Sequence, residues 1–213
     1  GGAVLTSDRD VYETALIQHD GGCAFRNHAE LLRIPIFAGF NLRASEIMGA
    51  IMREQLKRLD GILKRLRARK AAAVEVLGGS TGNGVGGDAY SLAPVSDAEG
   101  DCGVVTALQF ESEERMRAAQ KALKAEDINT SSPIDSGMHV YSNWEPILAQ
   151  RAAHHKQLNA FHLTDRKYEY TAEMCPQTTD VLSRTLFLGT ALGATPTQAR
   201  VRARKARKTL DAL

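Results

Sequence analysis

The sequence predicts an α/β protein in which one long helix separates two regions. Apolar residues follow helical spacing from about Ala44 to Leu77, a run far longer than an average helix. A glycine-rich stretch follows at residues 78–87, and strand-like and helical patterns alternate from residue 101 onward. We therefore expect three parts. They are residues 1–77, ending in the long helix, a linker or loop at residues 78–100, and a small C-terminal α/β domain at residues 101–213.

The N-terminal region begins with an apolar segment and a capped helix. Ala3 to Thr6 has the composition of a short buried strand. Asp8 can cap a helix running from about Arg9 to His19, and Gly21-Gly22 can end it. We expect the residues that recur at helical spacing to share one face of this helix, namely Val11, Tyr12, Ala15, Leu16 and His19.

The long helix is expected to bridge two domains. At 1.5 Å per residue, its ~34 residues would make a rod of roughly 50 Å. Gly61 lies within it and weakens it by about 1 kcal/mol relative to alanine. The glycine-rich stretch after it lacks the lysine and Ser/Thr of a nucleotide-phosphate loop, so a linker is expected.

The C-terminal region alternates strands and helices. The predicted strands are Val104–Phe110, Ile128–Ser131 and Leu186–Leu188. The predicted helices are Ser112–Lys124 with Met116, Ala119 and Leu123 inward, Trp144–Ala153, Gln177–Ser183 after Pro176, and a last helix opening at Thr195-Pro196 and running to Leu213.

Composition excludes several function classes. The 27 basic and 25 acidic residues nearly cancel, and the basic runs Lys57–Lys70 and Arg200–Lys208 are spaced as polar helix faces, so no nucleic-acid binding is expected. No apolar run approaches the ~18 residues that span a bilayer, so no membrane span is expected. The cysteines Cys23, Cys102 and Cys175 form neither a disulfide framework nor a zinc pattern, which favours a cytoplasmic protein.

Several histidines are candidate metal ligands or substrate-binding groups. His154-His155 with His162 suggests a metal site, but this spacing places no two of them on one helix face, so no metal site is expected. His139 follows a segment rich in serine, Ser131 to Ser136. From the residues alone, it reads as a partly buried histidine bonded to backbone groups.

The segment Gly39 to Glu46 directly precedes the long helix. Asn41 and Ser45 are both plausible caps, and the free backbone N–H groups at a helix start favour an anion such as a phosphate. Ordinary capping, with Arg43 and Glu46 as a surface pair, explains the same residues.

Three ordered motifs resemble the DegT/StrS family of pyridoxal-phosphate-dependent sugar aminotransferases. Gly39 to Glu46 resembles the family signature Gly-Tyr-Asn-Tyr-Arg-Met-Ser-Glu, with Leu42 and Ala44 departing from its aromatic and methionine. Gln55 to Asp60 resembles its Gln-Leu-x-x-Leu-Asp, and Gly1 to Asp8 resembles its Gly-Gly-x-Val-x-Thr-x-Asp strand. The resemblance covers nearly all of this chain but only about the second half of a family member.

The resemblance implies a fold, a cofactor and three site residues. The fold would be the C-terminal part of a type I pyridoxal-phosphate aminotransferase, with a long interdomain helix and a small α/β domain. Asn41 would reach across a homodimer interface to the phosphate of pyridoxal 5'-phosphate, and Arg43 would hold its loop. His139 would lie on the substrate side of the site.

The resemblance also places the catalytic group outside this chain. In the family the Schiff-base lysine lies a few residues before the Gly-Gly strand, hence upstream of Gly1. We therefore expect no catalytic residue here and no turnover by this polypeptide alone.

The implied reaction is transfer of an amino group from glutamate to a keto sugar linked to a nucleotide, or to a keto-cyclitol. Two alternatives stay open. One is a sugar dehydratase of the same family, which carries histidine at the lysine position. The other is a noncatalytic dimerisation module.

Overall fold

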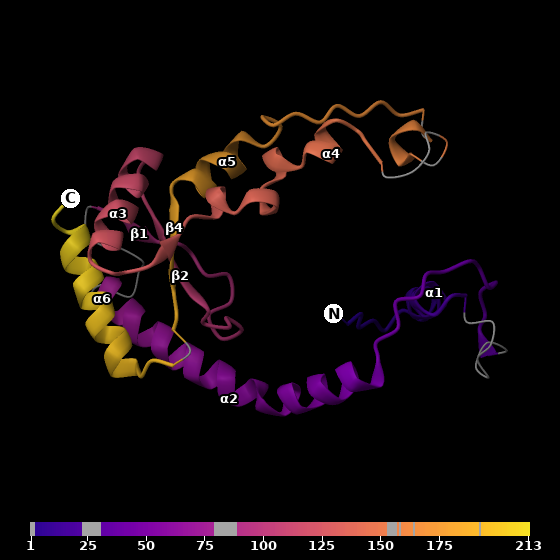
Figure 1. The fold of residues 1–213 in the computed structure, drawn as a ribbon, viewed down its shortest axis with the longest axis horizontal. Coiled ribbons are helices and arrows are strands. Elements are labelled where there is room, and N and C mark those ends of the chain that lie inside the picture. Colours follow the sequence, from indigo (N-terminus) through magenta and orange to yellow (C-terminus); the bar gives the residue numbers. More distant parts are fainter. Residues whose placement is uncertain are drawn as a thin grey trace. The chain divides into compact units, whose positions relative to one another are not determined.

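A computed structural model describes residues 3–22, 31–78, 89–152, 157, 159–163, 165–191 and 193–213 (Figure 1). The chain packs as two compact units, Gly1–Asp60 and Gly61–Leu213. Helix α2 runs through this division, so its first part belongs to one unit and its last part to the other. The domain boundaries predicted at residues 77 and 100 remain a prediction for the whole protein.

The first unit contains helix α1, Arg9–His19, as predicted. Asp8 caps it, because Asp8 Oδ1 accepts the backbone N–H of Asp10 at 2.8 Å and of Val11 at 3.2 Å. Gly21 and Gly22 follow with φ of 61° and 98°, a left-handed conformation in which glycine carries no steric penalty. The chain can therefore turn sharply away from the helix.

One prediction for this unit is wrong. Ala3 to Thr6 form no strand, and Val4 and Leu5 are exposed, because no segment that the structure describes pairs with their backbone. Helix α1 buries the side chains of Glu13 and Ile17, whereas Val11 and Tyr12 are exposed. Periodicity places residues on a face but does not say which face finds a partner.

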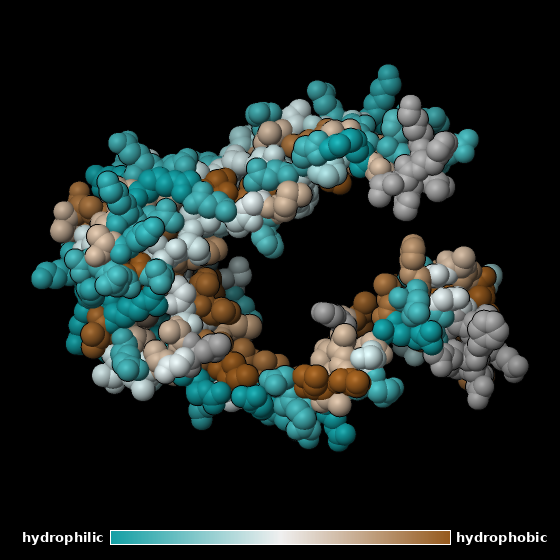
Figure 2. All heavy atoms as spheres, viewed as in Figure 1, coloured by the Kyte–Doolittle hydropathy of each residue, from teal (hydrophilic) through white to brown (hydrophobic). Residues whose placement is uncertain are grey.

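Helix α2, Glu46–Leu77, confirms the long-helix prediction with a later start. Its 32 residues span roughly 48 Å, and Ser45 Oγ caps it by accepting the N–H of Met48 at 3.2 Å. Figure 2 shows hydrophobic side chains gathered along its first half, and the structure has these residues exposed: Ile47, Met48, Ile51, Met52, Leu56 and Leu59. After Gly61 the helix buries Leu66, Arg69, Ala72 and Leu77 within the second unit.

The second unit is built on a four-stranded antiparallel sheet of order β1-β2-β4-β3. The strands are β1 Ser91–Leu92, β2 Val105–Gln109, β3 Thr130–Ser131 and β4 Thr185–Gly189. The last three lie where the sequence predicts strands. Strand β1 was not predicted, since two residues carry no detectable alternation.

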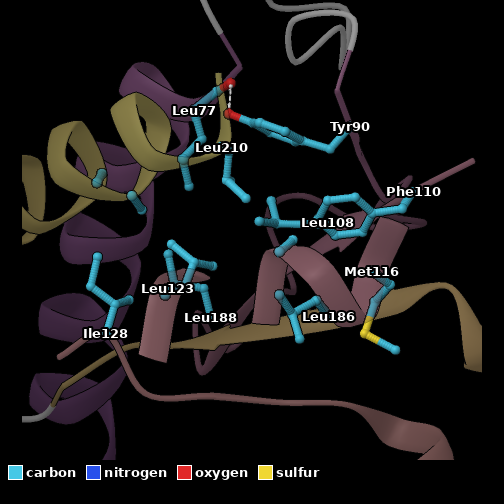
Figure 3. Packing of buried hydrophobic residues seen from close by; sticks show 13 residues of the cluster. Leu77, Tyr90, Leu108, Phe110, Met116, Leu123, Ile128, Leu186, Leu188 and Leu210 are labelled. Carbon is cyan, nitrogen blue, oxygen red and sulfur yellow. Dashed lines mark hydrogen bonds between the residues drawn. The ribbon is translucent and has the colours of Figure 1, made fainter. Parts of the chain in front are cut away.

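Helices α3 and α6 cover the sheet and close its core. Helix α3 is Glu113–Ala125, capped by Ser112, and α6 is Pro196–Leu210, opened by a reciprocal capping box between Thr195 and Gln198. Met116, Ala119 and Leu123 of α3 are fully buried, as predicted. Figure 3 shows the cluster that they join, with Leu77, Tyr90, Leu108, Phe110, Ile128, Leu186, Leu188 and Leu210.

The remaining segments are short. Helix α5, Pro176–Ser183, confirms its prediction, with Pro176 at the first helical position. Helix α4, Glu145–Leu148, is shorter than the predicted Trp144–Ala153, because Gln150 adopts a φ of 51° that a right-handed helix cannot accommodate. Ala153 and all but one residue of the glycine-rich stretch lie outside the described residues. No helix in the described part of the chain is long and apolar enough to cross a membrane.

Candidate functional site

The segment that resembles the family signature is held against the end of α1. Residues 40–42 run antiparallel to residues 18–21, with Asp20 and Asn41 facing one another as a β-bridge. Backbone N–H···O=C bonds of 2.7 to 2.9 Å join the two segments. The loop before α2 is therefore fixed by backbone pairing, and the position of Asn41 does not depend on side-chain packing alone.

Gly39 permits this close approach. A Cβ atom at this position would lie 2.4 Å from the carbonyl oxygen of Ile17 and 2.8 Å from that of Gln18. Real Cβ atoms do not approach backbone that closely. The glycine at the start of the motif is thus required by the packing of the loop on α1.

Asn41 is oriented by its neighbour Arg43. Arg43 Nε donates to Asn41 Oδ1 at 3.1 Å and lies 3.1 Å from Asp20 Oδ1, whose side chain is nearly buried. Because the guanidinium needs an acceptor, the carboxamide oxygen must face it, and the Nδ2 donors of Asn41 face away. Among the described residues, none accepts a hydrogen bond from that amide nitrogen.

This donor set fits a phosphate. Asn41 and Arg43 are exposed and supply only donors in the outward direction, and α2 begins a few residues later with its partial positive charge. Asp20 neutralises part of the Arg43 charge, so Arg43 acts mainly by holding the carboxamide in place. Asn41 is then the residue that would touch the anion.

His139 lies in the second unit and is described apart from Asn41 and Arg43. It ends a 3-10 turn, η4 Gly137–His139, and its side chain is exposed rather than buried. It lines a hollow with Ser132, Val140, Leu182 and Phe187. The interpretation of His139 as a partly buried histidine is wrong, because a one-turn helix at the surface leaves its imidazole open to solvent.

An ion pair borders the hollow beside His139. Arg117 Nη2 lies 2.8 Å from Asp135 Oδ1, and the two side chains make a second, shorter contact. The Arg117 guanidinium holds the pKa of the Asp135 carboxyl below its usual range, so this carboxylate is charged at neutral pH. Arg117 and Asp135 already satisfy one another at the edge of the hollow, and His139 is an exposed polar group in its lining.

A model of the DegT/DnrJ/EryC1/StrS aminotransferase family matches residues 1–203. The chain belongs to this family. The family prediction from the three motifs is therefore confirmed.

Three solved enzyme structures align with this chain over nearly its whole length. 3-Amino-5-hydroxybenzoic acid synthase aligns with a TM-score of 0.61 and 18% identity over 97% of this chain and 48% of that one. The sugar aminotransferase CalS13 from Micromonospora echinospora aligns at 0.58 and 18%, over 94% and 45%. E. coli GDP-4-keto-6-deoxy-D-mannose-3-dehydratase, solved with bound hydrated PLP, aligns at 0.57 and 14%, over 97% and 49%.

These alignments confirm the predicted fold class, the C-terminal part of a type I aminotransferase fold. The chain spans about half the length of each of these proteins. Because the sequence identities are only 14–18%, these alignments show a shared fold. They do not assign the reactions of these enzymes to this chain.

One buried charged residue of the first unit, Glu13, is not predicted from the sequence. The Glu13 carboxylate is almost fully buried, and it accepts hydrogen bonds from Arg9 Nε at 2.7 Å and from the backbone N–H groups of Arg33 and Ile34 at 2.8 and 3.3 Å. The bond from Arg9 is the largest cause that lowers the pKa of Glu13, while burial opposes it. Only the i,i+4 spacing of Arg9 and Glu13 could have pointed to it.

The predicted absence of a metal site remains a prediction. His162 lies at the end of the turn η7, Ala160–His162, whereas His154 and His155 lie outside the described residues. In the portion of the chain that the structure describes, no three His, Cys, Asp or Glu side chains gather closely enough to hold a metal ion.

Proposed function

We propose that the chain is part of a pyridoxal-phosphate-dependent aminotransferase that transfers an amino group from glutamate to a keto sugar or keto-cyclitol. The substrate we favour is linked to a nucleotide. Family membership supports the reaction class. The observation that carries the proposal is the outward-facing amide of Asn41, fixed by Arg43 and by the backbone pairing of its loop.

Pyridoxal phosphate is the cofactor that the family indicates. When bound, it supplies a carbonyl that takes up the amino group and a ring that draws electrons from the reacting carbon. Asn41 Nδ2 would donate a hydrogen bond to a phosphate oxygen, and Arg43 would keep the carboxamide from rotating. His139, which is exposed in its hollow, would lie on the substrate side of the site.

The phosphate that Asn41 binds would belong to the second copy in a homodimer. A heterodimer experiment on the complete protein tests this arrangement. One chain carries Asn41→Ala, and the other lacks the cofactor lysine that the resemblance places upstream of Gly1. If Asn41 acts across the interface, the chain with the lysine receives an intact Asn41 from its partner, so one complete site forms.

We expect the mixed dimer to recover up to about half of the native activity, while each variant homodimer is weak or inactive. A mixed dimer no more active than the Asn41→Ala homodimer would mean that Asn41 acts within its own chain. The conservative control Asn41→Gln tests whether reach or hydrogen-bonding chemistry matters.

We propose that the 213-residue polypeptide alone does not turn over, since the resemblance places the amine that bonds to the cofactor upstream of Gly1. Purified polypeptide mixed with pyridoxal phosphate should show no visible absorbance band that survives dialysis and is removed by borohydride. Such a band would place a cofactor-bonding lysine within these residues. A complete protein that binds no cofactor would support the noncatalytic dimerisation module.

A sugar dehydratase is the second candidate, because one of the aligned structures is a dehydratase. Both reactions could consume glutamate, so the product must decide. With ¹⁵N-glutamate, an aminotransferase yields a sugar that carries ¹⁵N in place of the keto oxygen. A dehydratase yields a sugar without ¹⁵N that has lost a hydroxyl oxygen, and mass spectrometry of the product separates the two.

A further inference from the structure

A small cavity lies inside the second unit, at the place where α2, β2, β4 and α6 meet. Alanine side chains form much of its lining, and the polar lining residues are Arg69, Thr106, Thr190, Gln198 and Arg202. The space open to the centre of a water molecule is about 50 Å³, where one water needs roughly 10–15 Å³. The cavity can therefore hold a few waters or one small anion.

Arg69 is the unusual residue of this cavity. Only 7% of it is exposed, and its Nε and Nη1 atoms are buried without any hydrogen-bond partner in the described structure. Buried donors of a charged group are strongly destabilising when unpaired, and such groups nearly always meet an acceptor. The guanidinium, which carries five N–H donors, is the group that proteins most often use to bind carboxylate and phosphate oxygens.

The described surroundings of Arg69 supply more positive charge. Arg202 donates to the backbone oxygens of Gly189 and Asn129, both at 2.9 Å, so its charge meets carbonyl dipoles. Gln198 lies in the first turn of α6, the positive end of a 15-residue helix. Among the residues that the structure describes, no acidic side chain lines the cavity.

We propose that this cavity is a binding site for a small oxyanion, such as phosphate, sulfate or a carboxylate, with Arg69 as its principal ligand. The anion would accept a hydrogen bond from the Arg69 guanidinium and neutralise a charge that the protein otherwise buries unpaired. The size of the cavity excludes a nucleotide. The cavity lies in the second unit, whereas the Asn41 loop belongs to the first.

The test measures melting temperature against inorganic phosphate in the complete protein with its cofactor bound. Sodium chloride keeps the ionic strength constant. Phosphate should raise the melting temperature of the native protein, as any ligand of the folded state does. Arg69→Met should lose this shift, with an apparent affinity at least about tenfold weaker, because it removes charge-assisted hydrogen bonds.

Arg204→Met is the matched control, since Arg204 lies on α6, a helix that borders the cavity, but is itself exposed and does not line the cavity. It removes the same charge and should retain the full phosphate response. Without phosphate, Arg69→Met should melt at or above the native temperature, because an unpaired buried charge is gone. Equal phosphate shifts in Arg69→Met and native protein, or none in the native protein, would overturn the proposal.

If Arg69→Met does not fold, an NMR titration of the native protein still tests the proposal. With ¹⁵N-arginine labelling, the Nε–H resonance absent from Arg69→Lys is that of Arg69, and it should move on titration with phosphate. An unmoved resonance overturns the proposal. Acetate and sulfate in separate titrations show whether the site accepts planar carboxylates, tetrahedral oxyanions or both.

Discussion

Gly39 is the residue on which the geometry of the signature loop depends most directly. In Gly39→Ala the new methyl group would lie 2.4 Å from the Ile17 carbonyl oxygen, so the loop or the end of α1 must shift. We expect a loss of about 1–3 kcal/mol in unfolding free energy, measured by urea denaturation followed by circular dichroism. Weaker cofactor binding by the complete protein should accompany it, because Asn41 is displaced.

Gly49→Ala is the control for this substitution. A Cβ atom at Gly49 meets nothing within 4 Å, and the residue lies inside α2, where alanine is favoured over glycine by up to about 1 kcal/mol. We therefore expect Gly49→Ala to stabilise the protein slightly. If the two variants unfolded at the same urea concentration, the close approach at Gly39 would not be what fixes the loop.

Glu13 should make the unfolding free energy of the first unit depend on pH in the acid range. Its pKa is lowered in the folded protein, mainly by the hydrogen bond from Arg9, from an ordinary value of 4.5. Its stabilising contribution is therefore complete above pH 4.5 and is lost as the pH falls through the lower folded value. We expect Glu13→Gln to unfold with a flatter pH profile below pH 4.5, measured by urea midpoints across the acid range.

Glu114→Gln supplies the comparison, because Glu114 is exposed in the first turn of α3. Its profile should follow that of the native protein. A Glu13→Gln variant with the same acid dependence as the native protein would show that the carboxylate gains nothing from its partners.

At the scale of elements, the sequence predicts best the helices whose caps are visible in it. Asp8, Ser112 and Thr195 each accept a backbone N–H at the predicted start. Elements set by distant contacts escape prediction. Strand β1 exists only because it pairs with β2. Glu13 of α1 is buried because it bonds to the backbone of Arg33, which lies twenty residues further along the chain.

Tyr90 contacts the C-terminal end of α2 within the second unit. Its buried hydroxyl donates to the Leu77 carbonyl oxygen at 3.0 Å, one of the carbonyls that a helix end leaves unpaired (Figure 3). Tyr90→Phe should lower the unfolding free energy by roughly 1–2 kcal/mol, measured by urea denaturation, because the carbonyl loses its partner while the ring packing remains.

Alkaline pH offers a second measurement on the same contact. Burial raises the pKa of Tyr90 from 10 to about 12. A raised tyrosine pKa means that the folded state favours the neutral phenol, so this contribution is complete below pH 10 and declines as the pH rises toward 12. Tyr90→Phe should lack that part of the decline. Equal alkaline profiles would mean that the hydroxyl is not buried as described.

At the scale of the whole molecule, the sequence identifies the motif residues of the site but not how they are held. Asn41 and Arg43 follow from the family signature, whereas the backbone pairing that fixes them joins segments twenty residues apart. Arg69 reads in the sequence as one charge of a basic run on a helix. Its burial depends on how β2, β4 and α6 pack around it, which no local pattern records.

The two units should differ in local stability. The apolar cluster lies wholly in the second unit, while the side chains buried in the described part of the first are those of Glu13 and Ile17. In native-state hydrogen exchange on the 213-residue chain, we expect amides of β2 and β4 to exchange only through global opening of their unit. Amides of α1 should exchange much faster, because few contacts oppose its local opening.

Leu186→Ala tests whether the units are also independent. Leu186 is fully buried in β4, so truncation should destabilise the second unit by roughly 2–5 kcal/mol. Amides of β2, β4 and α3 should then exchange at least about thirtyfold faster, since each 1.4 kcal/mol is a factor of ten. Those of α1 should be unchanged. Faster exchange in α1 as well would mean that one cooperative transition spans α2 and both units.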